Sequence, residues 1–301
     1  MMQRPAQPRL RTAPAAIFSA ATALTLALSA ALPGCTASVA QLQTARVLDK
    51  GHFEVTAGAS LVIPTQLVSA IADTAKLASK RIDEAEAAGR ALSEEEHKQA
   101  FETALTLVLF YPSVTPELAV RYGVIDDLDV GLRYASTLVD VDARYQLLRG
   151  ESAGLDVALT AGYGHHLETG PSMLTTVFDL LEKVDIAGYS RKDIDFGVVV
   201  GSQVASWLHL YGAGRYMISL TNVEGRLQEA EAAAGFDAKT DLDGTIHQFG
   251  GTAGLRAGYK YIWFGLELTV LRSLFRPMIF GAERNLDGWT VAPTFSLTGT
   301  W

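Results

Sequence analysis

Two histidines and two aspartates are the residues of this 301-residue chain whose types and spacing best suit catalysis. His165 and His166 end one predicted strand, and Asp193 and Asp195 begin the next strand across a long connection. A histidine beside a carboxylate can act as a general base that activates water, which would make the site a hydrolase. Two histidines are too few to ligate a zinc ion, and the sequence contains no phosphate-binding loop. We therefore predict no cofactor, no metal and no enzyme activity. A hydrolase whose site lies at the outer rim of the fold is the alternative from another functional class.

A second set of residues could set the electrostatics of an interior. Charged side chains of both signs recur at every second position of the predicted strands, opposite the apolar positions. The predicted lumen charge network consists of Arg121, Asp129, Arg133, Asp140, Asp142, Arg144, Asp156, Arg256 and Glu267. The candidate pairs are Arg121 with Asp129 or Glu117, Arg133 with Asp140 or Asp142, Arg144 with Asp156, and Arg256 with Glu267. These pairs could seal the interior or line a narrow polar channel whose selectivity they would set.

The elements that carry these charges have a two-residue period. Apolar and polar residues alternate over segments of about ten residues, the pattern of strands with one greasy face. The segments are 53–61, 117–124, 128–135, 139–147, 155–163, 194–203, 208–218, 247–261, 264–274 and 289–301. Short links alternate with long links at 63–114, 165–192, 220–245 and 275–287, and only the short link near Ser136 breaks the alternation. The sequence therefore predicts an all-β fold, an antiparallel up-and-down β-barrel of about ten strands.

Residues 47–301 thereby resemble bacterial outer-membrane β-barrels, and RYGVIDDLDVGLRY is a hairpin common among them. A soluble sandwich or lipocalin-like barrel would point its apolar half inward, leaving the charged half outside. Aromatic residues near strand ends, namely Tyr259, Tyr261, Trp263 and Trp301, suit a membrane-interface girdle. The resemblance also implies that the alternating last strand is an assembly signal read by the barrel-assembly machinery, with Phe295, Leu297 and Trp301 as its apolar residues.

The first 34 residues have the order of a bacterial export signal, with a basic start and an Ala/Leu-rich core. Leu32, Pro33, Gly34 and Cys35 resemble the lipobox of bacterial lipoproteins, which implies acylation of Cys35, the only cysteine. Thr36 in place of an aspartate implies sorting to the outer membrane by the lipoprotein-sorting machinery. An uncleaved anchor and an ordinary secretory signal remain alternatives. The predicted organisation is a signal peptide at 1–34, a lipidated tether at 35–50 and the barrel at 51–301.

The long connections carry helical patterns. Within the insertion 63–114, Gly89 marks the end of one amphipathic helix, and Ser93 with Glu96 forms a capping box that begins another. Amphipathic stretches recur at 171–184 and 225–235. The net charge of −8 argues against a nucleic-acid partner. We predict a non-enzymatic component of the outer-membrane bilayer with a largely sealed polar lumen. The alternative within transport is a channel for small solutes or hydrophobic molecules, gated by the 63–114 hairpin.

Overall fold

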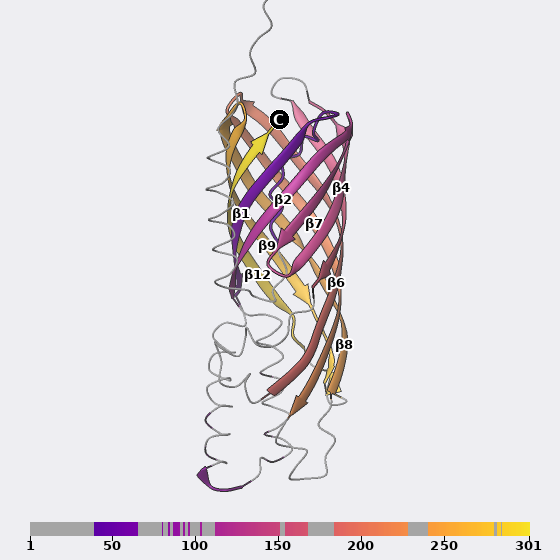
Figure 1. The fold of residues 1–301 in the computed structure, drawn as a ribbon, viewed down its shortest axis with the longest axis vertical. Helices are drawn as coiled ribbons and strands as arrows, with labels where there is room; N and C mark the ends of the chain where they lie inside the picture. The colour runs from indigo at the N-terminus through magenta and orange to yellow at the C-terminus, as the bar shows by residue number, and fades with distance from the viewer. Residues whose placement is uncertain are drawn as a thin grey trace, which may run out of the picture.

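Ten antiparallel strands close into a barrel in the computed structural model, which describes residues 39–65, 80, 84, 87–90, 93, 96, 103, 112–150, 154–167, 184–227, 240–279, 282–283 and 285–301. The strands are β1 (Phe53–Pro64), β2 (Ser113–Ile125), β3 (Leu128–Ala135), β4 (Leu138–Leu148), β5 (Leu155–His166), β6 (Val184–Ala205), β7 (Leu208–Leu227), β8 (Thr240–Tyr259), β9 (Ile262–Leu274) and β12 (Gly288–Thr300). A two-stranded sheet, β10 (Met278–Ile279) and β11 (Ala282–Glu283), lies in the connection before β12. The predicted ten-stranded architecture is confirmed (Figure 1).

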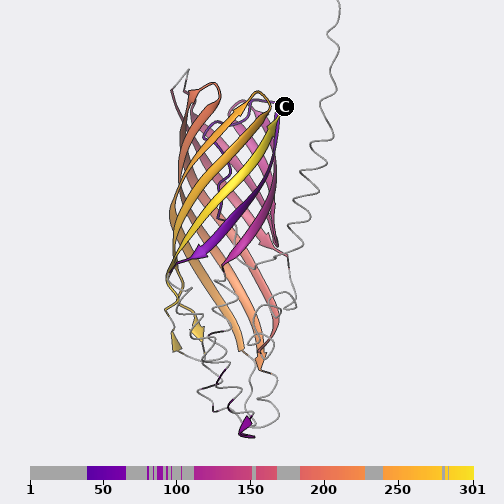
Figure 2. The same ribbon diagram turned by 90° about the vertical axis from the view of Figure 1, so that its left-hand side faces the viewer.

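The barrel closes where the first strand meets the last. Each strand pairs with its neighbour in sequence, and β1 completes the ring by pairing with both β2 and β12. The amide nitrogens of Phe53 and Trp301 each donate to the other residue's carbonyl oxygen at 3.0 Å. Their rings stack with centroids 5.1 Å apart. The last residue therefore takes part directly in closing the ring, where β1 and β12 lie side by side (Figure 2).

The two ends of the barrel differ. The tight turns after β2, β6 and β8 and the end of β4 lie at the end of the barrel that also holds the start of β1 and the C-terminus (Figure 2). The strand ends that the long connections join lie at the other end, together with the two-residue turn between β3 and β4, where Ser136 has a φ of 56°. We call these the turn end and the loop end. In transmembrane barrels short turns face the periplasm and long loops face outward.

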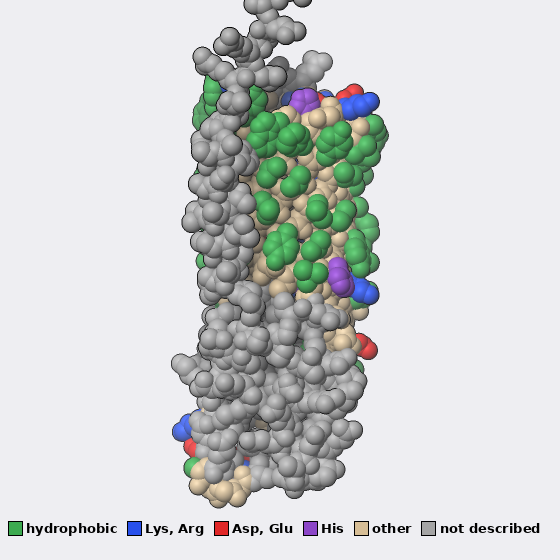
Figure 3. Space-filling model, in the orientation of Figure 1, with side chains coloured by type: hydrophobic (Ala, Val, Ile, Leu, Met, Phe, Trp, Pro, Cys, Tyr) green, Lys and Arg blue, Asp and Glu red, His purple; other side chains and the backbone are tan. Residues whose placement is uncertain are grey.

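The exterior is apolar and the interior is polar. Leu268 on β9 leaves 48% of its surface exposed, whereas Asp129 on β3 is fully buried at 0%. Hydrophobic side chains are spread over the described wall, and charged side chains are seen only near its upper and lower edges (Figure 3). The predicted alternative of a soluble sandwich or lipocalin-like barrel is wrong, because the apolar half of each strand points outward. An exterior of this kind is stable only in contact with lipid. Among the described residues, no helix has the length and hydropathy needed to cross a bilayer.

One aromatic residue departs from the predicted girdle. Tyr259 and Tyr261 are exposed at the turn end, as expected. Trp263 instead faces the mouth of the lumen, where His209 meets its ring edge-on at 5.0 Å and the Arg256 guanidinium lies 5.7 Å from its centroid. Side chains of a strand point alternately to its two faces. Ile262 and Phe264 point outward on β9, so Trp263 between them points inward.

Three strands extend beyond their predicted ends. β6, β7 and β8 continue past the predicted segments, so residues 184–192, 220–227 and 240–245 are strand rather than loop. Outward positions there become polar, as where the Asn222 side chain donates to Asp243 at 2.7 Å. The greasy alternation that marks the other strands is lost, which explains the misplaced boundaries. It also contradicts the beginning of the helix predicted at 225–235.

The predicted loop helices lie largely outside the described residues, but their end signals are present. Gly89 has a φ of 59°, in the left-handed region suited to a helix end. The Ser93 amide donates to the Glu96 carboxylate at 2.8 Å, and the Glu96 amide donates back to Ser93 Oγ at 3.3 Å. A hydrogen bond from Arg90, with further bonds from Ser93, lowers the pKa of Glu96 to about 2. The capping box itself is therefore formed.

Substituting Leu268 with arginine tests the membrane-facing wall. Leu268 lies midway along β9, opposite Ala253 and Pro293. A charge at this depth should lower the free energy of unfolding by about 2–4 kcal/mol. Ile262→Arg at the turn-end edge is the matched control and should cost about 0–1 kcal/mol. Urea unfolding in lipid vesicles measures both values, and equal costs at the two positions would contradict the transmembrane placement.

Candidate functional site: the occupied lumen

The lumen contains a segment of the chain's own N-terminal part. Residues 39–50, which we call the lumen segment, run inside the ring of strands before β1 begins (Figure 1). At the loop end, Val39 packs against Val62, Leu271 and Ala292. At the turn end, the Lys50 amide donates to the carboxylate of Asp126, in the turn after β2, at 3.3 Å. The segment therefore spans the lumen from one end towards the other. The domain prediction named residues 35–50 a lipidated tether and did not anticipate that residues 39–50 lie in the lumen.

One buried glutamate holds the middle of the lumen segment. The Glu267 carboxylate accepts the backbone amides of Gln41 at 2.6 Å and Leu42 at 2.8 Å. The hydroxyls of Tyr211 and Thr269 also donate to it, each at 3.1 Å. Four donors compensate for burying this carboxylate, which the described lysines and arginines do not pair. Glu267 therefore binds the lumen segment and does not form the predicted ion pair with Arg256.

Two arginines hold carbonyl groups of the lumen segment. Arg133 Nη1 donates to the Ala40 carbonyl oxygen at 2.7 Å, and Arg144 Nη1 donates to the Thr44 carbonyl oxygen at 2.6 Å. Charge-assisted bonds of this kind are stronger than those between neutral groups. Both guanidinium groups are buried. The wall thus supplies acceptors to the segment's amides and donors to its carbonyls.

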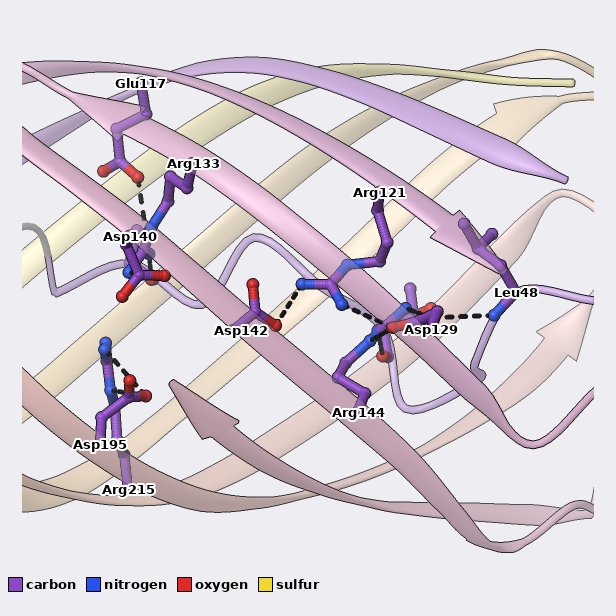
Figure 4. A network of polar contacts seen from close by, with 12 residues as sticks. Leu48, Glu117, Arg121, Asp129, Arg133, Asp140, Asp142, Arg144, Asp195 and Arg215 are labelled. Carbon is purple, nitrogen blue, oxygen red and sulfur yellow. Dashed lines mark hydrogen bonds and ion pairs between the residues drawn. The ribbon is translucent and has the colours of Figure 1, made fainter. Parts of the chain in front are cut away.

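Asp129 is the centre of the charge network nearest the turn end (Figure 4). Its carboxylate receives Arg121 Nη1 at 2.5 Å, Arg144 Nε at 2.9 Å and the Leu48 backbone amide at 2.9 Å. Arg121 also binds Asp142. The predicted contact between Arg121 and Asp129 is present, whereas Arg144 pairs with Asp129 and not with Asp156. The strand register explains this choice, because Arg144 lies directly opposite Asp129 on the neighbouring strand.

A second group of ion pairs lies nearer the loop end. Arg133 Nη2 is 3.5 Å from Asp140 Oδ1, and Arg133 Nη1 is 3.9 Å from Glu117 Oε2. On β6 and β7, Arg215 Nη2 is 3.1 Å from Asp195 Oδ1 (Figure 4). Charges of opposite sign therefore meet throughout this part of the lumen.

The remaining predicted charges lie near the turn end. Arg256 Nη2 pairs with Glu54 at 2.7 Å, a partner absent from the predicted pairs. Asp156 accepts the Gly150 backbone amide at 3.0 Å and so fixes the turn between β4 and β5. Asp156 lies four residues from Thr160, which is the residue opposite Arg144, so the predicted pairing with Arg144 is out of register.

The two candidate catalytic histidines do not come together. Neighbouring residues of a strand point to opposite faces, so His165 is exposed on the exterior while His166 is buried in the lumen. His166 lies 3.2 Å from Thr137 Oγ1 and 3.3 Å from Asp193 Oδ2. Arg191 Nε also donates to Asp193 at 2.7 Å. Asp193 is thus shared between a histidine and an arginine in a buried network. The described residues contain no group of three or more potential metal ligands.

The lumen segment is the part of the site that the sequence interpretation missed. Its sequence, VAQLQTARVLDK, has no two-residue period, because it forms no strand ladder and most of its residues are buried whichever way they point. Two properties could have indicated its place. It is mostly uncharged, and it directly precedes a strand series whose inward charges need partners. Tyr211 and Arg191 were also missed as lumen residues.

The closed ring, the apolar exterior and the polar interior define a transmembrane β-barrel, and residues 39–50 occupy part of its lumen. No protein-family model and no curated protein sequence matches the chain. Among solved structures, similarity is found to Neisserial surface protein A, at 10% identity and a TM-score of 0.32, covering 83% of this chain and 99% of that one. The outer membrane protease OmpT from Escherichia coli matches at 7% identity and a TM-score of 0.40, covering 86% and 100%. The CymD monoaromatic hydrocarbon channel matches at 8% identity and a TM-score of 0.26, covering 84% and 89%.

Proposed function

We propose that the protein is a non-enzymatic component of the bacterial outer membrane, a lipidated barrel that its own lumen segment keeps closed. The observation that carries this proposal is the set of bonds between wall charges and the segment's backbone. Glu267 binds two amides, and Arg133 and Arg144 bind two carbonyls. A stretch of chain fixed in this way occupies the space that a solute would need.

The location and the anchor rest on different observations. The apolar exterior between a turn end and a loop end supports placement in the outer membrane, since spanning barrels of this form have that asymmetry. The lipobox-like sequence before Cys35 supports export and acylation. The assembly signal that the resemblance assigns to Phe295, Leu297 and Trp301 is part of the same proposal. Its structural support is the position of Trp301 at the seam of the ring.

The alternative of a rim hydrolase is less favoured by the site. A general base needs an accessible nitrogen that can take a proton from water. His166 is 1% exposed, and both of its ring nitrogens lie near protein oxygens. His165 faces the exterior, where it cannot reach the same site.

A planar-bilayer recording tests the proposed function. The refolded mature chain should show no channel openings, because the lumen segment and the ion pairs fill the bore. The same preparation should migrate differently on gels before and after heating, which shows that the barrel has folded. Steady openings from the unaltered, folded protein would contradict a closed lumen and favour the channel alternative.

A further inference from the structure

The direction of the lumen segment carries information about the chain that precedes it. Val39 contacts Val62, which lies near the loop end of β1, and Ala45 packs against Val199 and Tyr211, nearer the turn end. Leu48 then reaches Asp129 at the start of β3. The segment therefore runs in one direction, from the loop end at Val39 to the turn end at residue 50.

The height of Val39 in the barrel follows from β1. Nine residue steps separate Phe53, at the turn end, from Val62, beside Val39. A rise of about 3.3 Å per residue and a tilt of roughly 40° place Val39 roughly 23 Å above the turn-end edge. The apolar band of an outer-membrane barrel is about 25 Å tall. Val39 therefore lies close to the outer boundary of that band.

We infer that the chain is threaded through its own barrel, so that the polypeptide preceding Val39 leaves the lumen at the cell surface. Four residue steps link Val39 to Cys35 and span at most about 14 Å. That reach is too short to return to the periplasmic leaflet from the height of Val39. The acyl chains on Cys35 would therefore anchor in the outer leaflet. This last step rests on the lipidation proposed above, whereas the threading does not.

A designed disulfide tests whether the lumen segment lies inside the ring in cells. A Cβ added at Gly201 would lie 3.2 Å from the Ala45 Cβ, a little closer than the roughly 3.5–4.5 Å typical of disulfides. It would also lie 2.8 Å from the Leu210 carbonyl oxygen, so the strand must shift slightly away from β7, and heat-modifiable gel mobility is checked first. Ala45→Cys with Gly201→Cys should form a cross-link that shifts the folded protein on non-reducing gels. Gly214 is the matched control, because an added Cβ there meets nothing within 4 Å. Ala45→Cys with Gly214→Cys should give no cross-link.

An epitope test addresses the direction of threading. An epitope inserted immediately before Val39 should be labelled by antibody on intact cells. The same epitope placed in the turn after Gly150 is the control and should be labelled only after the outer membrane is permeabilised. Labelling of the first epitope only after permeabilisation would overturn the inference. Failure of the Ala45–Gly201 cross-link in a folded, heat-modifiable barrel would overturn it as well.

Fatty-acid labelling separates the inference from the proposed function. Incorporation of labelled palmitate that is lost in Cys35→Ala supports the anchor. Surface labelling of the epitope without palmitate incorporation would keep the threading and remove the outer-leaflet lipid. A periplasmic epitope with palmitate incorporation would keep the lipidation and overturn the threading.

Discussion

A barrel that begins at Asp49, without the rest of the lumen segment, should conduct ions where the mature protein is silent. The segment's amides and carbonyls satisfy Glu267, Arg133 and Arg144 in the intact protein. Water would have to replace them after truncation, because buried charges do not remain without partners. The strand pairing is independent of residues 39–48, so the ring itself should still form. Single-channel recording in planar bilayers measures the change from no openings to steady openings.

Two controls make this result specific. The cross-linked Ala45→Cys, Gly201→Cys protein should remain silent at applied voltages, since its segment cannot leave. Recording the same protein after the disulfide is reduced tests whether residues 39–48 can leave the lumen. Openings that appear only after reduction would show that this segment gates a channel. Silence of the truncated barrel, with its folded gel mobility intact, would show that wall side chains alone fill the bore.

Substituting Asp129 with alanine should destabilise the barrel by about 3–5 kcal/mol, the usual cost of removing one partner from a buried ion pair. Asp129 neutralises Arg121 and Arg144 together and also accepts the Leu48 amide. Its removal leaves two buried guanidinium groups with a single carboxylate, Asp142, bound to one of them. Urea unfolding followed by tryptophan fluorescence gives the free energy.

Asp126→Ala is the matched control, because Asp126 is an exposed aspartate three residues away that also accepts a backbone amide of the lumen segment. Its loss should cost within about 0.5 kcal/mol, as is usual for surface positions. A combined Asp129→Ala, Arg144→Leu variant should recover part of the lost stability, since it removes one stranded charge. Equal stability of Asp129→Ala and the unaltered protein would contradict the central role of this carboxylate.

The strands could be predicted because the wall imposes a single rule on them. A residue such as Leu268 meets lipid while its neighbour Glu267 meets the lumen, and this alternation is visible in the sequence. The rule fails where a residue is surrounded by one environment. Most of the lumen segment is covered by protein, and the ends of β7 and β8 include polar residues on the outward face as well. Neither stretch therefore shows a two-residue alternation of apolar and polar residues.

The charge pairs could be predicted only in part. The inward positions follow from parity, but the partners depend on register and on what else enters the lumen. Arg144 is opposite Asp129 because of the register between β3 and β4, which could not be predicted from the alternation of residues alone. Glu267 does not pair with Arg256 because its carboxylate accepts the backbone amides of Gln41 and Leu42. Parity likewise separates His165 from His166, so adjacency in sequence was misleading there.

A chain that passes through a closed ring restricts the order in which the molecule can be built. The ring closes at the seam between β1 and β12, where Phe53 and Trp301 pair. The acyl chains proposed on Cys35 would have to cross a bore lined with buried charges if the seam closed first. We therefore expect the ring to form around residues 39–50, so that β12 pairs with β1 only after this segment is in the lumen. Pairing of Phe53 with Trp301 is then the last step of assembly, after which residues 39–50 can no longer leave sideways between strands.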